Sequence, residues 1–157
     1  MTESKLDRTD RRIVNALQRD GRLANNELAA KVSLSPSPCL RRVRSLEESG
    51  VIKQYVALVD PVKVGLEMLA YITVKLEKKG EMPAEEFSSA VNSWSEVTEC
   101  YAMTGEADYL LRVQVRDLDH FSRFLMGKLL KQSYIVDVKS SFALARIKET
   151  TVLPLAP

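Results

Sequence analysis

The segment Ser35–Gly50 (SPSPCLRRVRSLEESG) constrains the fold more than any other part of this 157-residue chain. It opens with Ser35, a residue type that caps helix N-termini, followed by Pro36 at the first helical position, where proline costs no hydrogen bond. Pro38 also lies within the first turn, so it does not interrupt a helix. The segment therefore predicts a helix that begins after Ser35 and stops at Gly50.

Two shorter helices precede this one. Leu6–Leu17 has apolar residues at spacings that suit one helical stripe. A second helix is expected over residues 25–32, with Asn25 or Asn26 as its N-cap. Residues 33–35 then form a tight turn into the third helix. Two helices, a three-residue turn and a third helix are typical of a helix-turn-helix domain.

The third helix has two unlike faces. Its apolar residues share one side and predict packing against the first two helices: Cys39, Leu40, Val43 and Leu46. Its outward side, which arginines flank, suits the DNA major groove, because arginine can bind guanine with two hydrogen bonds or pair with phosphate. That side carries Ser37, Pro38, Arg41 and Ser45. We assign base edges mainly to Ser37, Pro38 and Arg41, and phosphates to Ser35, Arg42 and Arg44.

A run of arginines on a helix is often only a solvated surface, and that alternative has to be weighed. The charge distribution favours DNA binding. Residues 1–60 carry 11 lysines and arginines against 8 acidic residues, and three arginines but no acid lie between Ser35 and Leu46. Together with the predicted helix-turn-helix, this local basic face predicts a partner of double-stranded DNA.

The second half alternates strands and helices. Val51–Val59 before it is β-prone and is expected to be extended. Strands are predicted at Leu69–Glu77, Val97–Thr104, Ala107–Val115 and Ile135–Lys148, and helices at Pro83–Trp94 and Leu118–Leu130. The order βαββαβ is that of a ferredoxin-like fold, in which two helices cover one face of an antiparallel sheet. The open face is expected to be partly apolar, with a second subunit covering it, because of Ile72, Val74, Phe142 and Leu144.

Several classes of protein are disfavoured by composition. The two cysteines, Cys39 and Cys100, lie far apart, and the chain has one histidine, so we expect no metal site and two reduced thiols. No catalytic set or phosphate-binding glycine loop is present, so we expect no enzyme and no cofactor. The apolar runs are short and the first residues are charged, which predicts neither a membrane span nor a signal peptide.

The chain resembles the Lrp/AsnC family of transcriptional regulators. The resemblance rests on LDRTDRRIVNALQRDGR, LAAKVSLSPSPCLRRVRSLEESGVI, TGEADYLLRV and SSFALARIKETTVLPL, which together span nearly the whole chain. It implies an α+β chain: a winged-type helix-turn-helix over residues 1–60, a linker over 61–68, and a ferredoxin-like effector-binding and oligomerisation domain over 69–157. It also implies dimers that commonly assemble into octamers, in a cytoplasmic, nucleoid-associated protein.

The resemblance further implies an amino-acid effector site. Its elements are the strand before the Thr-Gly turn, the turn itself and the last strand of a neighbouring dimer. They supply here Cys100, Tyr101, Met103, Thr104, Gly105, Glu106, Asp108, Ser140, Ser141 and Phe142. Asp108 or Glu106 would accept from the ammonium group, and N–H groups near Gly105 would bind the carboxylate. The alternative is an ordinary hairpin turn with a solvated Asp108.

Leucine or methionine is the expected effector of an allosteric DNA-binding regulator. A different hypothesis is an architectural, nucleoid-type DNA-binding protein that responds to no effector. Both share the same N-terminal half, so only the response to amino acids separates them.

Overall fold

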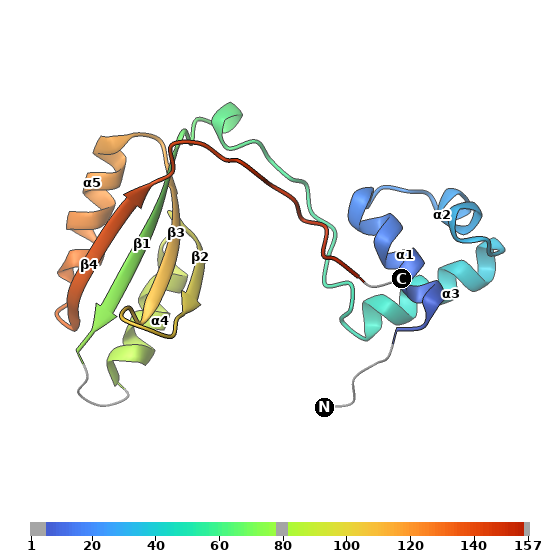
Figure 1. Ribbon diagram of the computed structural model, residues 1–157, viewed down its shortest axis with the longest axis horizontal. Helices are drawn as coiled ribbons and strands as arrows, with labels where there is room; N and C mark the ends of the chain where they lie inside the picture. The colour runs from blue at the N-terminus through green and yellow to red at the C-terminus, as the bar shows by residue number, and fades with distance from the viewer. Residues whose placement is uncertain (1–5, 78–81, 156–157) are drawn as a thin grey trace. The chain divides into compact units, whose positions relative to one another are not determined.

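The computed structural model describes residues 6–77 and 82–155 (Figure 1). The described chain forms two compact units. The first extends to Ala57 and also includes the C-terminal tail from Lys148 onward, whereas the second is Leu58–Ile147. The sequence places domain boundaries at residues 60 and 69; in the structure the chain passes from one unit to the other near residues 57 and 147.

The first unit consists of three helices: α1 (Arg8–Arg19), α2 (Asn25–Val32) and α3 (Pro36–Glu48). They pack around a small apolar core, because each helix contributes one buried stripe. The core consists of Ile13 from α1, Leu28, Ala29 and Val32 from α2, and Cys39 and Leu46 from α3. The helix-turn-helix arrangement predicted from the caps and the periodicity is therefore present.

The caps of these helices agree with the sequence in part. Asp7 is the N-cap of α1 and accepts a hydrogen bond of 2.8 Å from the backbone N–H of Asp10. The prediction of Asn25 or Asn26 as the N-cap of α2 was wrong: the cap is Ala24, whose N–H donates to the carboxylate of Glu27. A glutamate three residues into a helix can satisfy the cap N–H in this way, without a polar cap side chain.

The β-prone segment after α3 forms no strand. Residues 53–60 have no regular secondary structure, because none of the described strands pairs with them. Tyr55 nevertheless anchors the start of this segment, since its hydroxyl donates to Glu47 Oε1 over 3.0 Å. Burial and the Glu47 carboxylate together raise the pKa of Tyr55 to about 12.

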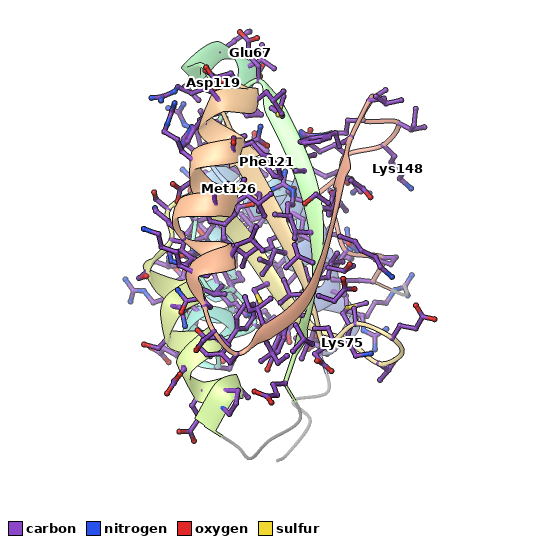
Figure 2. All side chains as sticks on the ribbon, turned by 90° about the vertical axis from the view of Figure 1, so that its left-hand side faces the viewer. Glu67, Lys75, Asp119, Phe121, Met126 and Lys148 are labelled. Atoms are coloured by element: carbon purple, nitrogen blue, oxygen red, sulfur yellow. The ribbon has the colours of Figure 1, made fainter. Side chains whose placement is uncertain are left out.

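The second unit is a four-stranded antiparallel sheet with two helices. In chain order it contains β1 (Met68–Leu76), α4 (Met82–Ser93), β2 (Val97–Ala102), β3 (Tyr109–Val115), α5 (Leu118–Gly127), and β4 (Ile135–Phe142), with short 3-10 turns at Val62–Val64 and Leu129–Lys131. The strand order is β2-β3-β1-β4, as expected for a split βαβ fold. The helices pack on one face, and Figure 2 shows α5 lying along the sheet with Phe121 labelled on it. The predicted ferredoxin-like architecture is confirmed.

The register reverses one prediction about the open face. Ile72 and Val74 are fully buried among α4 and α5, so they do not belong to the open face. Phe142 pairs with buried Ala70, and its ring contacts Phe121 of α5 with centroids 4.9 Å apart. A strand slipped by one residue presents the opposite set of side chains, and sequence alone did not settle which set faced the helices. The open face instead carries mostly polar residues, among them Tyr71, Thr73, Lys75, Arg112, Asp137 and Lys139.

The last strand is also shorter than predicted. It ends at Phe142 rather than at Lys148. Leu144, expected to be one of the apolar residues on the open face, lies beyond the strand and is fully exposed. The β-prone sequence after residue 142 has no partner strand among the described elements, so it does not form a strand despite its β propensity.

Candidate functional site

The N-terminal half of α3 is presented by a tight turn. Ser33 adopts the left-handed conformation with φ of 59°, and the N–H of Leu34 donates to Ala29 O over 2.9 Å. The side chain of Asn25 then donates to Pro36 O over 2.9 Å, which ties the first turn of α3 to α2. The start of α3 is therefore held through its backbone, by the turn at Ser33 and by the side chain of Asn25. These contacts do not use the side chains of the first turn of α3.

Burial along α3 follows the two expected faces in part. Cys39 and Leu46 are buried and Val43 is half-buried, but the prediction that Leu40 is buried was wrong, since it is 39% exposed. Leu40 lies about 100° around the helix from Cys39, at the edge of the apolar stripe. Arg42 is half-buried. Ser35 is the N-cap, but its hydroxyl makes no capping hydrogen bond. The exposed predicted DNA contacts are Ser35, Ser37, Arg41, Arg44 and Ser45, and Pro38 is half-buried.

Arg42 differs from the other two arginines of α3. Its Nη1 lies 2.7 Å from a carboxylate oxygen of Asp7 and 2.7 Å from one of Asp10. The N–H of Asp10 and then the Arg42 guanidinium hold the pKa of Asp7 below its ordinary value, and the two carboxylates raise the pKa of Arg42. Arg42 therefore binds α1 to α3 and has fewer donors left for phosphate than Arg41 or Arg44.

The turn between β2 and β3 is held by Asp108. The backbone N–H of Asp108 donates to Val74 O over 3.0 Å, and its carbonyl accepts from Met103 N over 2.8 Å. Its carboxylate accepts from the N–H of Leu76 over 2.8 Å, at the end of β1. Gly105 has φ of 115°, a conformation that residues with a side chain rarely adopt. Asp108 is thus a structural part of the turn, whereas the Glu106 side chain is exposed.

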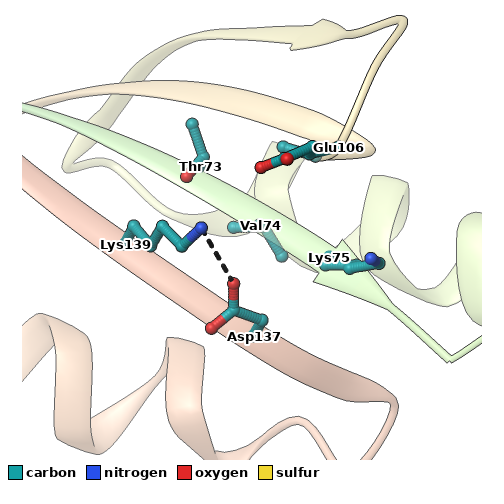
Figure 3. Close-up of a pocket in the computed structure, with 7 residues that line it drawn as sticks. Thr73, Val74, Lys75, Glu106, Asp137 and Lys139 are labelled. Carbon is teal, nitrogen blue, oxygen red and sulfur yellow. Dashed lines mark ion pairs between the residues drawn. The ribbon is translucent and has the colours of Figure 1, made fainter.

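Pockets lie on both sides of this turn. One of about 430 Å³ opens on the helix-free face and is lined by Thr73, Val74, Lys75, Glu106, Ala107, Asp137 and Lys139 (Figure 3). Another of about 320 Å³ lies next to α4 and includes Met103 and Asp108. Of the predicted effector residues around the turn, Glu106 therefore lines the first pocket and Met103 and Asp108 line the second, whereas Thr104 and Gly105 line neither of these two.

The first pocket combines both signs of charge. Lys75 pairs across the strands with Asp137, and Thr73 pairs with Lys139. Lys139 Nζ lies 3.9 Å from Asp137, and Figure 3 shows these two side chains extending from β4 while Glu106 comes from the turn. Sequence reasoning missed Thr73, Lys75, Asp137 and Lys139. The alternation in ITVKL places Thr73 and Lys75 on one face of their strand, and the alternation in VDVKS does the same for Asp137 and Lys139. Only the register between the two strands shows that these four residues lie together.

The remaining predicted effector residues are not brought together within one chain. Cys100 and Tyr101 lie on β2 and Ser140, Ser141 and Phe142 on β4, the two opposite edges of the sheet. Two strands separate these edges, which places them about 14 Å apart. Burial raises the pKa of the Cys100 thiol.

A separate ion pair fixes the end of α5. Lys128 Nζ contacts both carboxylate oxygens of Glu96, at 2.9 and 2.8 Å, and His120 Nε2 lies 3.6 Å from the same carboxylate. Burial raises the pKa of Glu96, but hydrogen bonds from Lys128 and the backbone outweigh it, and the net pKa is lowered. In the described ranges, no three His, Cys, Asp or Glu side chains are grouped closely enough to hold a metal ion. No helix in those ranges is sufficiently long and apolar to cross a membrane.

Comparison with known proteins identifies both units. Residues 6–53 match the model for a winged helix-turn-helix DNA-binding domain, and residues 69–153 match the model for the Lrp/AsnC ligand-binding domain. The chain belongs to the Lrp/AsnC family. Members of this family are DNA-binding transcriptional regulators with an amino-acid ligand-binding domain, so the predicted family and function are confirmed.

Individual members of the Lrp/AsnC family align over nearly the full chain. The leucine-responsive regulatory protein of Escherichia coli K12 is 37% identical over 148 residues, which cover 94% of this chain and 90% of that protein. The crystal structure of a Neisseria meningitidis transcriptional regulator in complex with L-methionine is 46% identical, with a TM-score of 0.92 over 95% of this chain and 96% of that chain. An AsnC family regulator from Agrobacterium tumefaciens is 43% identical, with a TM-score of 0.89 over 94% and 96%.

Proposed function

We propose that this regulator reads its operator with the N-terminal half of α3. The main support is that Arg41 and Arg44 are exposed on a helix whose opposite side is buried in the domain core. Arg41, Ser37 and Pro38 would contact base edges. Arg44 and the Ser35 hydroxyl would contact phosphates, and the free donors of Arg42 would add a weaker phosphate contact.

We propose further that the pocket of Figure 3 binds the charged head of an amino acid. Lys75 and Lys139 supply cations for a carboxylate, and Glu106 and Asp137 supply acceptors for an ammonium group. The Neisseria meningitidis regulator was crystallised as a complex with L-methionine, which supports a small aliphatic amino acid as the ligand. Leucine and methionine are the two effectors to be tested, because the name of the Escherichia coli relative refers to leucine.

The apolar part of the effector would then extend from this pocket toward a neighbouring subunit. Predicted effector residues on β2 and β4 lie too far apart to meet within one chain, which supports a site completed by a second copy. We propose a homodimer that assembles further, with an octamer as the expected form, in a cytoplasmic protein associated with the nucleoid. A dimer would place two recognition helices about one DNA helical turn apart.

Calorimetric titration of the full chain with L-leucine and L-methionine tests this function, combined with operator binding at each effector concentration. Binding of either amino acid, with a change in operator affinity or assembly size, would support the proposal. DNA binding without a response to any of the twenty amino acids would favour the architectural alternative. Turnover of a substrate would contradict the expectation that the chain is not an enzyme.

A further inference from the structure

The C-terminal tail belongs structurally to the DNA-binding unit. Residues from Lys148 onward group with the three helices, although β4, which precedes them, is part of the other unit. The chain therefore joins the two units twice, once after α3 and once after β4 (Figure 1). The second connection begins after β4, the strand that carries Asp137 and Lys139, and its residue Leu153 is hydrogen-bonded to Gln18 of α1.

One attachment of the tail is to Gln18 of α1. Gln18 of α1 donates from Nε2 to Leu153 O over 3.3 Å, and its Oε1 accepts from Leu153 N over 2.6 Å. A single side-chain amide thus satisfies both backbone groups of one residue, as a neighbouring strand would. Pro154 favours an extended conformation at Leu153, in which the N–H and C=O groups point to the same side.

The surrounding tail is shaped to present Leu153. Val152 N donates to Thr150 Oγ1 over 3.1 Å, and Leu155 N donates to Leu153 O over 3.0 Å. The side chains of Val152 and Leu155 are half-buried, whereas that of Leu153 is 67% exposed. The attachment at Leu153 is therefore made by its backbone, and Gln18 is the side chain on which it depends.

An ion pair and a shared core join α1 to α3. Arg42 is bonded to Asp7 and Asp10 of α1, and the two helices share the core that contains Ile13 and Cys39. Neither connection between the units forms a strand, because residues 53–60 and residues 143–155 both lack regular secondary structure. The tail differs in that it begins at the strand that carries Asp137 and Lys139 and is hydrogen-bonded to α1 near its other end, so its length limits how far these two attachment points can separate.

We propose that the Gln18–Leu153 clamp makes the tail a second tether, which conveys the state of β4 to the DNA-reading helix. This inference rests on the proposed response to an amino acid. An effector that changes the position of β4 would then change the orientations available to α3, and so operator affinity. Such coupling requires that the effector bind more tightly to one position of β4 than to another. The tether then makes the orientations of α3 depend on the position of β4.

The test compares three variants of the full-length protein. Gln18→Met has a similar length but removes both hydrogen bonds, and Gln18→Glu keeps only the acceptor for Leu153 N. Gln132→Met is the matched control, since Gln132 also makes two hydrogen bonds, to Lys128 O and from Tyr134, but in the other unit. For each protein, three quantities are measured. The first is the rate at which carboxypeptidase Y digests the tail, which reports how often the tail detaches and is called the release rate below. The others are the affinity for L-leucine and L-methionine, and the operator affinity with and without the amino acid.

We expect Gln18→Met to release the tail about tenfold faster than wild type, because two hydrogen bonds no longer oppose opening and cleavage follows the open population. Gln18→Glu should be intermediate, and Gln132→Met should match wild type. Amino-acid binding should be unchanged in Gln18→Met, while the effector-induced change in operator affinity falls by at least half.

The outcomes separate the clamp from the proposed function. Equal release rates in wild type and Gln18→Met would overturn the clamp. If Gln18→Met bound the amino acid and kept the full change in operator affinity, the tether would be wrong while the proposed function stood. If wild type bound no amino acid, the effector proposal and the coupling would both be wrong, and the release rates would still decide whether the clamp exists.

Discussion

Nη1 of Arg42 lies 2.7 Å from Oδ1 of Asp10, so a side chain in the middle of α3 is bonded to the first turn of α1. The same nitrogen contacts the N-cap Asp7. Arg42 thus connects the cap of one helix to the DNA-reading helix, although its position beside Arg41 gives no sign of this in the sequence. Its main contribution is to hold α3, and that role can be distinguished from phosphate binding.

Arg42→Gln should lower stability and should change the salt dependence of DNA binding by clearly less than one full phosphate contact would. Each phosphate contact contributes about −0.9 to the slope of log K against log salt. Loss of a helix-connecting ion pair that is partly exposed should instead cost about 1 kcal/mol of unfolding free energy. Asp10→Asn should produce the same loss of stability. A slope that becomes shallower by about 0.9 in Arg42→Gln would show instead that Arg42 makes a full phosphate contact.

Arg41→Ala and Arg44→Ala should weaken DNA binding in different ways. Arg41→Ala should cost about 1–3 kcal/mol at the specific operator and much less at unrelated DNA, because a base contact is lost. Arg44→Ala should weaken both by similar factors and reduce the salt slope by about 0.9. Fluorescence anisotropy at several salt concentrations measures both quantities. Light scattering should show an unchanged assembly, and equal losses for both variants on every sequence would refute the assignment.

Lys139→Met should weaken binding only of those ligands that have a carboxylate, because Lys139 is proposed to contact that group. We expect about a tenfold loss of affinity for L-leucine, as for one charge-assisted hydrogen bond, and little change for leucinamide, which has no carboxylate. Glu106→Gln should weaken both ligands, since both carry the ammonium group. Calorimetry measures the four affinities. Identical losses for leucine and leucinamide in Lys139→Met would contradict a lysine–carboxylate contact.

Glu96→Gln should destabilise the effector-binding unit. The Glu96 side chain is 10% exposed and binds Lys128 through both oxygens, so loss of this charge-assisted contact should cost about 1–2 kcal/mol in urea unfolding. Lys128→Met should cost a similar amount, and the double variant should cost less than the sum. Additive losses in the double variant would show that the two side chains are not energetically coupled.

Acid should weaken the contact between α1 and α3. The pKa of Asp7 is lowered in the folded chain by the N–H of Asp10 and by Arg42. A lowered pKa means that the stabilisation is complete well above the ordinary value of 3.8 and disappears as the pH falls through the folded-state pKa. Asp7→Asn should therefore make the stability of the first unit less dependent on pH in the acid range around and below that value, as followed by circular dichroism. A pH profile equal to that of wild type would contradict this role of Asp7.

Much of the architecture is encoded locally. Ser35, the prolines after it and the apolar spacing of α3 specify a capped helix with one buried face, and the structure has this helix at Pro36–Glu48. The order of strands and helices likewise predicts the βαββαβ fold, because periodicity is a property of short segments. The TGEADYLL motif, together with the N-terminal motifs, indicates the family without any tertiary information.

Contacts between distant segments required the tertiary structure. The register of β1 with β3 and β4 decides that Ile72 faces the helices and that Lys75 lies beside Asp137. The partners of Arg42 and the attachment of Leu153 to Gln18 depend on side chains 32 or more residues away. Caps and periodicity act within a few residues, whereas register, ion pairing and tail docking are selected by the free energy of the whole packed chain. For this reason the amino-acid sequence established the helices, the fold class and the family, and the folded structure alone established which faces and side chains meet.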